Sequence, residues 1–136
     1  MNPRLKSILA VVAGIVSGAV VISVVEMLSP YRPPEGLDFN DKAKITEWVQ
    51  TLPASAFGIL LLAYFLGSVA GGWVTNRIAS STPYRPALVT GFGMFAAGLM
   101  NLIAIPHPLW FTVGSSLLYF AGAWIGGRMV KPGPPV

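Results

Sequence analysis

Three polar side chains stand out in a chain that is otherwise mostly apolar: Glu26, Asn101 and His107. Glu26 is the one ionisable residue within a long apolar run. An intramembrane carboxylate is costly unless it is protonated, paired or in contact with water, and it often marks a functional site. Asn101 lies near the end of another apolar run and His107 follows it, so the three residues could share one outward-facing polar pocket. Such a pocket would bind a small or amphipathic ligand and would allow proton transfer between Glu26 and His107.

The same residues also have purely structural explanations. A glutamate near a helix end can reach the membrane interface, and a histidine between Pro106 and Pro108 is more often exposed in a corner. One histidine and one carboxylate are fewer ligands than a metal site uses, so the sequence predicts no metal site and no cofactor. There is no cysteine, which excludes thiolate catalysis. No serine has a base at a defined spacing, and we therefore predict that the protein is not an enzyme.

These residues must be positioned by apolar helices. Of the 136 residues, 54% are hydrophobic and 10% charged, and the mean hydropathy is +0.66, which is typical of a membrane protein. A helix needs about 20 apolar residues to cross a hydrocarbon layer of roughly 30 Å. The first apolar run is too long for the core of a cleaved signal peptide and is expected to span the membrane. We predict an all-α integral membrane protein, an up-down-up-down four-helix bundle and a single transmembrane domain over residues 1–136, with spans at about 6–29, 53–76, 86–105 and 109–128.

The distribution of charge predicts the orientation in the membrane. With four spans both termini lie on one side, and the cations on that side have no acidic neighbour. The segment 30–52 on the other side holds four acidic residues. Because cytoplasmic loops are rich in Lys and Arg, we expect a bacterial inner-membrane protein with both termini in the cytoplasm. The net charge of +4 is explained by this rule and by attraction to the lipid bilayer, so no nucleic-acid partner is predicted. The six cations are Arg4, Lys6, Arg77, Arg85, Arg128 and Lys131.

The outer segment 30–52 should contain one short helix, with Asp38 or Asp41 as its N-terminal cap. Its apolar residues recur at helical spacing and form one face. Two interpretations remain open: the helix lies on the outer membrane surface with Trp48 at headgroup depth, or it covers the end of the bundle. The C-terminal tail, residues 129–136, is predicted to be disordered. The apolar face consists of Ile45, Trp48, Val49 and Leu52.

A repeated pattern, Tyr-Phe-x-Gly-x-x-x-Gly-Gly, occurs at residues 64–72 and again at 119–127. Small residues four positions apart let helix backbones approach closely in lipid. The repeat is either a true duplication or an independent result of helix packing, and the sequence leaves both open. A similar stripe in the first helix leads to Glu26, which is therefore expected to face the bundle interior. The predicted packing residues are Gly14, Gly18, Gly67, Gly71, Gly72, Gly122, Gly126 and Gly127.

Two hypotheses for function follow. The first is a non-enzymatic membrane subunit that packs against itself or a larger membrane partner through its glycine stripes, one of which should then face lipid within the monomer. The second is an oligomeric carrier, or a membrane protein that binds a lipid or small molecule, with a pocket around Glu26 and Asn101.

Several segments resemble a group of short, uncharacterised bacterial inner-membrane proteins. The resemblance implies a four-helix membrane fold and implies no function. The segment 71–77 is also similar to a turn of major facilitator transporters, but Asn76 replaces the acidic residue there and the chain is far too short for that fold. The segments that resemble the bacterial group are Glu26-Met27, residues 33–38, Thr51-Leu52-Pro53, Gly71-Gly72-Trp73 with Arg77, and residues 106–110.

Overall fold

The structure, a computed structural model, describes residues 2–79 and 85–131. Within these ranges the chain forms five helices and no strand. Four helices are long and apolar enough to cross a membrane: α1 (Pro3–Leu28), α3 (Ala54–Ala79), α4 (Arg85–Ala104) and α5 (Leu109–Met129). Their bounds lie within three residues of the predicted spans. The fifth, α2 (Lys42–Gln50), is the short helix expected in the outer segment.

The ends of the helices follow from local chemistry. The Asn2 side chain accepts a hydrogen bond of 2.9 Å from the Arg4 backbone N–H and caps α1, and Pro3 occupies the first turn, where its missing N–H costs nothing. α1 ends before Ser29 and Pro30 because proline cannot continue the helical hydrogen bonds. In α2 the predicted cap Asp41 is confirmed, because its carboxylate accepts from the Lys44 N–H at 3.2 Å.

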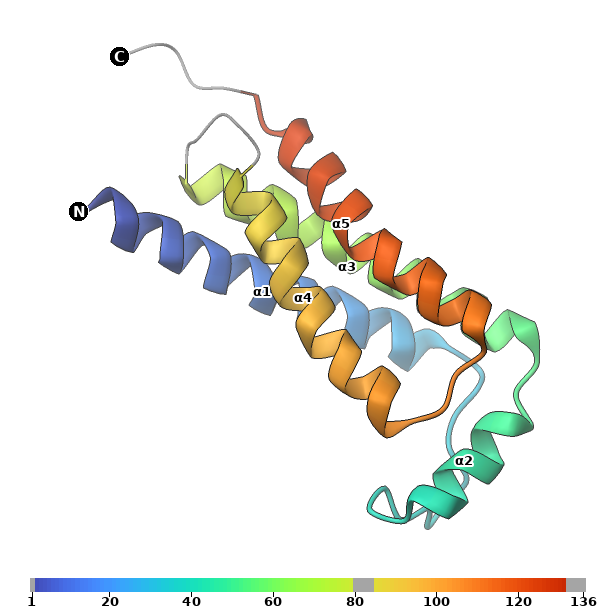
Figure 1. Cartoon of the computed structure of the whole chain (residues 1–136). Helices are drawn as coiled ribbons and strands as arrows, with labels where there is room; N and C mark the ends of the chain where they lie inside the picture. The colour runs from blue at the N-terminus through green and yellow to red at the C-terminus, as the bar shows by residue number, and fades with distance from the viewer. Residues whose placement is uncertain (1, 80–84, 132–136) are drawn as a thin grey trace.

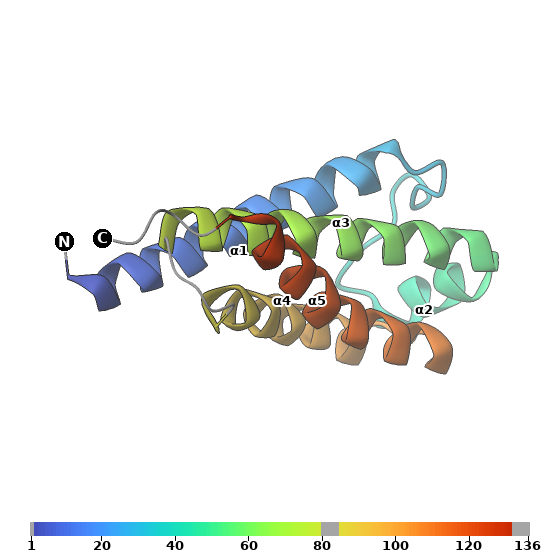
Figure 2. The same cartoon turned by 90° about the horizontal axis from the view of Figure 1, so that it is seen from above.

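The long helices pack side by side, and successive ones run in opposite directions (Figure 1). The start of α1 and the end of α5 lie at one end of the molecule, and α2 lies at the other end (Figures 1 and 2). We call the end with α2 the outer end and the opposite one the inner end. α3 is the central helix: it packs against α1, α4 and α5, and it buries more residues than any other helix. Residues 132–136 of the predicted disordered tail lie outside the described residues, and Met129 belongs to α5.

Glycine permits the close contact between α1 and α3. A methyl group on Gly71 would lie 2.9 Å from the carbonyl oxygen of Gly14, and one on Gly67 would lie 2.8 Å from the carbonyl oxygen of Gly18. Carbon atoms of a real side chain do not come so close to a backbone oxygen, so any larger residue would force the helices apart.

The two copies of the repeat meet at the interface between α3 and α5, which run in the same direction. Gly72 packs against the backbone of Ala123, and Gly126 packs against the backbone of Val69. All eight predicted packing glycines are buried within the monomer. The expectation that one glycine stripe faces lipid is therefore wrong, because α1, α4 and α5 cover these faces.

The outer helix α2 turns its apolar face toward the bundle. Ile45 is 6% exposed and Val49 is 8% exposed, and both belong to the same hydrophobic cluster as Phe57 and Phe111 of the long helices. Trp48 is partly buried against this cluster. Of the two interpretations of the outer helix, the structure therefore favours a cover over the end of the bundle.

Candidate functional site

The three polar residues chosen from the sequence lie in two places at the outer end. Glu26 and Asn101 both interact with Tyr64 of α3. His107 lies in the corner between α4 and α5 and lines a separate pocket beneath α2. The predicted single pocket with all three residues is therefore not found. His107 faces α2 in a pocket beneath that helix, whereas Glu26 lines an opening beside the end of α1, and the two pockets share no lining residue.

Tyr64 is the centre of the first group. The Asn101 side chain lies near its hydroxyl, and the Glu26 carboxyl lies within electrostatic range of Tyr64 and of Tyr119 of α5. The two tyrosine rings stack with centroids 5.2 Å apart and an interplanar angle of 25°. Four helices thus contribute one polar side chain each to a group that we call the tyrosine cluster: Glu26, Tyr64, Asn101 and Tyr119.

The repeat explains why the two tyrosines meet. Tyr64 and Tyr119 occupy the same position in the two copies, and the copies lie side by side in parallel helices. Gly98 makes room on α4, since a methyl group there would lie 2.8 Å from Cε2 of Tyr119. Both rings are buried, with 7% of Tyr64 and 3% of Tyr119 exposed. The phenol groups are consequently held in fixed positions and can donate or accept hydrogen bonds.

Glu26 is the member of the tyrosine cluster that lies at the surface of the molecule. Its side chain is exposed, which corrects the expectation that it faces the interior. Ile22 follows the two glycines in the contact stripe of α1, and its bulk against Gly67 lets α1 and α3 separate toward the outer end (Figure 2). The carboxylate therefore lies at an opening of about 520 Å³ between α1 and the segment that follows it. Besides Glu26, this opening is lined by Ser23, Met27, Arg32 and Pro33.

Arg32 gives the opening a second charge. Its guanidinium donates a hydrogen bond of 3.0 Å to the Met27 carbonyl oxygen, so the last turn of α1 holds it in place. A carboxylate and a guanidinium consequently face the same space, beside Ser23 and the apolar side chain of Met27. This arrangement can bind a group with opposite charges, or an amine together with a hydrogen-bonding group.

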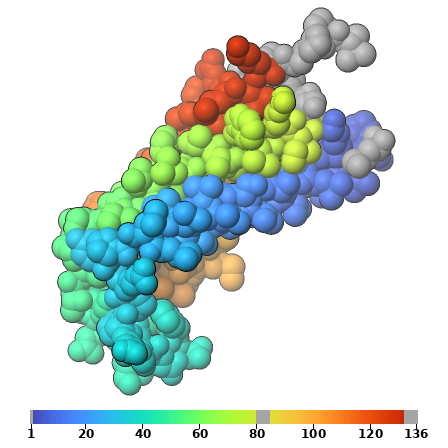
Figure 3. All heavy atoms as spheres, turned by 180° about the vertical axis from the view of Figure 1, so that it is seen from behind, coloured from blue at the N-terminus to red at the C-terminus, as the bar shows by residue number. Residues whose placement is uncertain are grey.

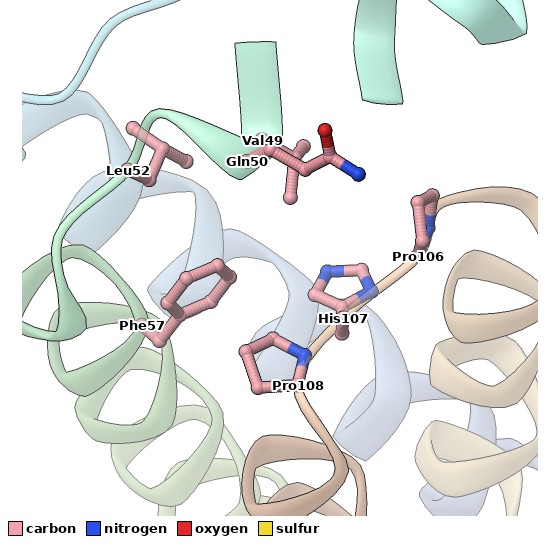
Figure 4. A pocket seen from close by; sticks show the side chains of 7 residues that line it. All are labelled: Val49, Gln50, Leu52, Phe57, Pro106, His107 and Pro108. Carbon is pink, nitrogen blue, oxygen red and sulfur yellow. The ribbon is translucent and has the colours of Figure 1, made fainter. Parts of the chain in front are cut away.

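The second place is a pocket of about 300 Å³ under α2, shown in Figure 4. The His107 ring stacks on Phe111 with ring centroids 4.9 Å apart. It also makes an edge-to-face contact with Phe57, with ring centroids 6.1 Å apart. Nδ1 of His107 lies 2.6 Å from the carbonyl oxygen of Ile105. The pocket is lined by Val49, Gln50, Leu52, Phe57, Pro106, His107 and Pro108.

The tautomer of His107 follows from this hydrogen bond. A carbonyl oxygen can only accept, so Nδ1 carries the hydrogen and Nε2 has a free lone pair. Burial lowers the pKa of His107, although the hydrogen bond to Ile105 opposes this shift. The imidazole is therefore neutral at pH 7, and its Nε2 can accept one hydrogen bond from a small polar group.

Several residues of these sites were not predicted from the sequence. Tyr64 and Tyr119 were recognised only as part of a packing repeat, although a tyrosine at the same position in both copies was a signal for a polar pair. Gln50 and Arg32 carried no such signal, because their roles depend on how the outer segment folds back. A third polar contact, 2.6 Å between Thr75 Oγ1 and Thr90 Oγ1, lies buried toward the inner end.

Comparison with protein-family models, with curated proteins and with solved structures finds no match to this chain.

Proposed function

We propose that the four long helices cross a bacterial inner membrane as an up-down-up-down bundle, with both termini in the cytoplasm. The length and apolar character of the helices support insertion. The charges support the orientation, since all five acidic residues lie between positions 26 and 47, on the side of α2. In this orientation the tyrosine cluster and the pocket under α2 belong to the outer half of the protein.

We further propose that the protein is not an enzyme and that it binds a small or amphipathic ligand at its outer end, around Glu26 and Asn101. The observation that supports this most is the place of Glu26, whose carboxylate is at once exposed in an opening and near the buried rings of Tyr64 and Tyr119. A ligand in the opening would meet Glu26 and Arg32 with its polar part, while its apolar part stays beside Met27 and the lipid. Because both charges face one opening, we expect a zwitterionic or amine-bearing headgroup.

The test is native mass spectrometry of the untagged protein, gently extracted from its own membrane. We expect a retained small molecule in the wild type and its loss in Glu26→Gln, which keeps the shape of the side chain and removes its charge. The matched control is Glu35→Gln, since Glu35 is an exposed carboxylate of the same outer segment that does not line the opening. Equal retention in both variants, or a wild type without any bound molecule, would contradict the proposal.

A second candidate function is a subunit that packs against a second copy or a larger membrane partner. The glycine stripes do not support it, because all eight glycines are covered within the monomer. The surface of α1 supports this function, since this helix buries only three residues and presents one ridge of β-branched side chains. A dimer or a larger protein in the same mass spectra would favour this function. The ridge consists of Val12, Val16, Val20 and Val24, each more than half exposed.

A further inference from the structure

An apolar groove is lined by residues of α1, α3 and α5. These three helices lie side by side on the face of the molecule shown in Figure 3. The groove exists because α3 lies between the other two helices and both pack against it without closing over it. Its volume is about 610 Å³, and Ser17 is its one polar lining residue. The remaining lining is aliphatic or aromatic and includes Val16, Val20, Leu66, Ala70, Trp73 and Met129.

We propose that this groove holds an acyl chain of an anionic phospholipid, whose phosphate is bound by Arg77 at the inner end. The proposal rests on the membrane insertion proposed above and does not depend on the Glu26 site.

The position of Arg77 follows from helix geometry. Leu66, Ala70, Trp73 and Arg77 are spaced four, three and four residues apart in α3, so they lie along one face. Long side chains of a helix lean toward its N-terminus. Arg77 is exposed and lies one helical turn beyond Trp73 on this face, at the inner end of the groove. Tryptophan at this level suits the boundary between acyl chains and headgroups.

A second cation reaches the same end from α1. Gly14 packs against Gly71, so the N-terminal turns of α1 lie beside the C-terminal turns of α3. Lys6 precedes Ser17 by three helical turns and shares its face of α1, which is the face that lines the groove. All acidic side chains lie at positions 26–47, toward the outer end. The inner mouth of the groove is therefore positively charged, with no carboxylate side chain nearby to neutralise it.

This combination of an apolar groove and a cationic mouth matches the chemistry of an anionic phospholipid. Arginine binds phosphate through two parallel hydrogen bonds, and anionic lipids are enriched in the cytoplasmic leaflet. An apolar helix of a partner protein would fill the groove but would leave the cations at its mouth without a counter-charge. Charge complementarity thus selects a lipid over a second transmembrane helix.

The experiment compares phosphatidylglycerol with phosphatidylcholine of the same acyl chains, added to the delipidated protein in detergent and counted by native mass spectrometry. We expect one phosphatidylglycerol to bind at least tenfold more tightly than phosphatidylcholine. Arg77→Gln should weaken its binding about tenfold to hundredfold, as the loss of a charge-assisted hydrogen bond would. Arg85→Gln is the matched control, because it removes an exposed cation from the same end but from α4, which does not line the groove. It should change the affinity by less than threefold.

A second variant tests the groove without changing charge. Ala70→Phe fills it with an aromatic ring, and it should abolish the preference for phosphatidylglycerol while the melting temperature shows that the protein remains folded. Equal binding of the two lipids, or equal losses with Arg77→Gln and Arg85→Gln, would overturn the proposal. So would a dimer of the chain that Ala70→Phe dissociates, since a second copy would then occupy the groove. Alkaline extraction of membranes that contain the protein tests insertion separately, so a failure of the lipid site can be told from a failure of membrane placement.

Discussion

Gly126→Ala should destabilise the protein although alanine is the better helix former. The added methyl group would meet the carbonyl group of Val69, with its carbonyl carbon at 2.8 Å, and the backbone nitrogen of Trp73 at 2.9 Å. Favourable contacts between carbon atoms lie at roughly 3.5–4.0 Å. Since backbone atoms cannot rotate away as a side chain can, α3 and α5 must separate by about half an ångström or more.

The expected cost follows from two opposing effects. Overpacking of a core position costs about 1–3 kcal/mol, and contact with backbone favours the upper part of this range. Replacing glycine by alanine within a helix gains about 0.8–1 kcal/mol. We therefore expect a net loss on the order of 1–2 kcal/mol for Gly126→Ala.

Gly114→Ala is the matched control in the same helix. Its methyl group would meet only the Leu61 side chain, at 3.9 Å, which is an ordinary contact. The helix-forming gain is then unopposed, and stability should rise by roughly 0.5–1 kcal/mol.

The assay is the melting temperature of the purified protein in one detergent. Samples are heated to a series of temperatures, and the loss of the monomer peak in size-exclusion chromatography gives the fraction unfolded. The scan rate must be the same for all variants, because membrane proteins often unfold irreversibly. We expect Gly126→Ala to melt below the wild type and Gly114→Ala to melt at or above it. If both variants shift in the same direction, the close backbone contact between α3 and α5 at Gly126 is not present in the protein.

Two further predictions concern the outer end. Val49→Asp places a charge on the buried face of α2 and should release this helix from the bundle, so trypsin should cut faster after Lys42 and Lys44. Gln50→Asp adds the same charge at the exposed neighbouring position and should leave the cleavage rate near that of the wild type. For His107, burial places the pKa below its usual value of about 6.5, so the unfolded chain binds more protons than the folded one just below that pH. Stability should consequently fall as the pH drops from about 6.5 through the folded pKa, and melting temperatures measured from pH 8 to pH 5 should show a smaller decline in His107→Gln. An identical decline in both proteins would show that His107 does not cause it.

Much of the fold was readable from local patterns. The four long helices, their bounds within three residues and the cap of α2 follow from apolar runs, proline positions and an aspartate before a helical pattern. The apolar face of α2 was also evident, because its periodicity depends on neighbouring residues only. The surface that this face contacts was not evident, since hydropathy does not show whether an apolar face packs against lipid or against other helices. The described contacts favour the bundle, with Ile45 and Val49 buried.

The sequence by itself determined which segments are helical and which residues are small enough to let helices touch. Only the tertiary structure decided which helices are neighbours. In the folded chain every glycine of the predicted stripes is buried within the monomer, and Tyr64 stacks on Tyr119. His107 lies in a different pocket from Glu26 and Asn101. The physical reason is that helix formation and hydropathy are properties of adjacent residues, whereas pairing of faces depends on the whole set of side chains that must fit at once.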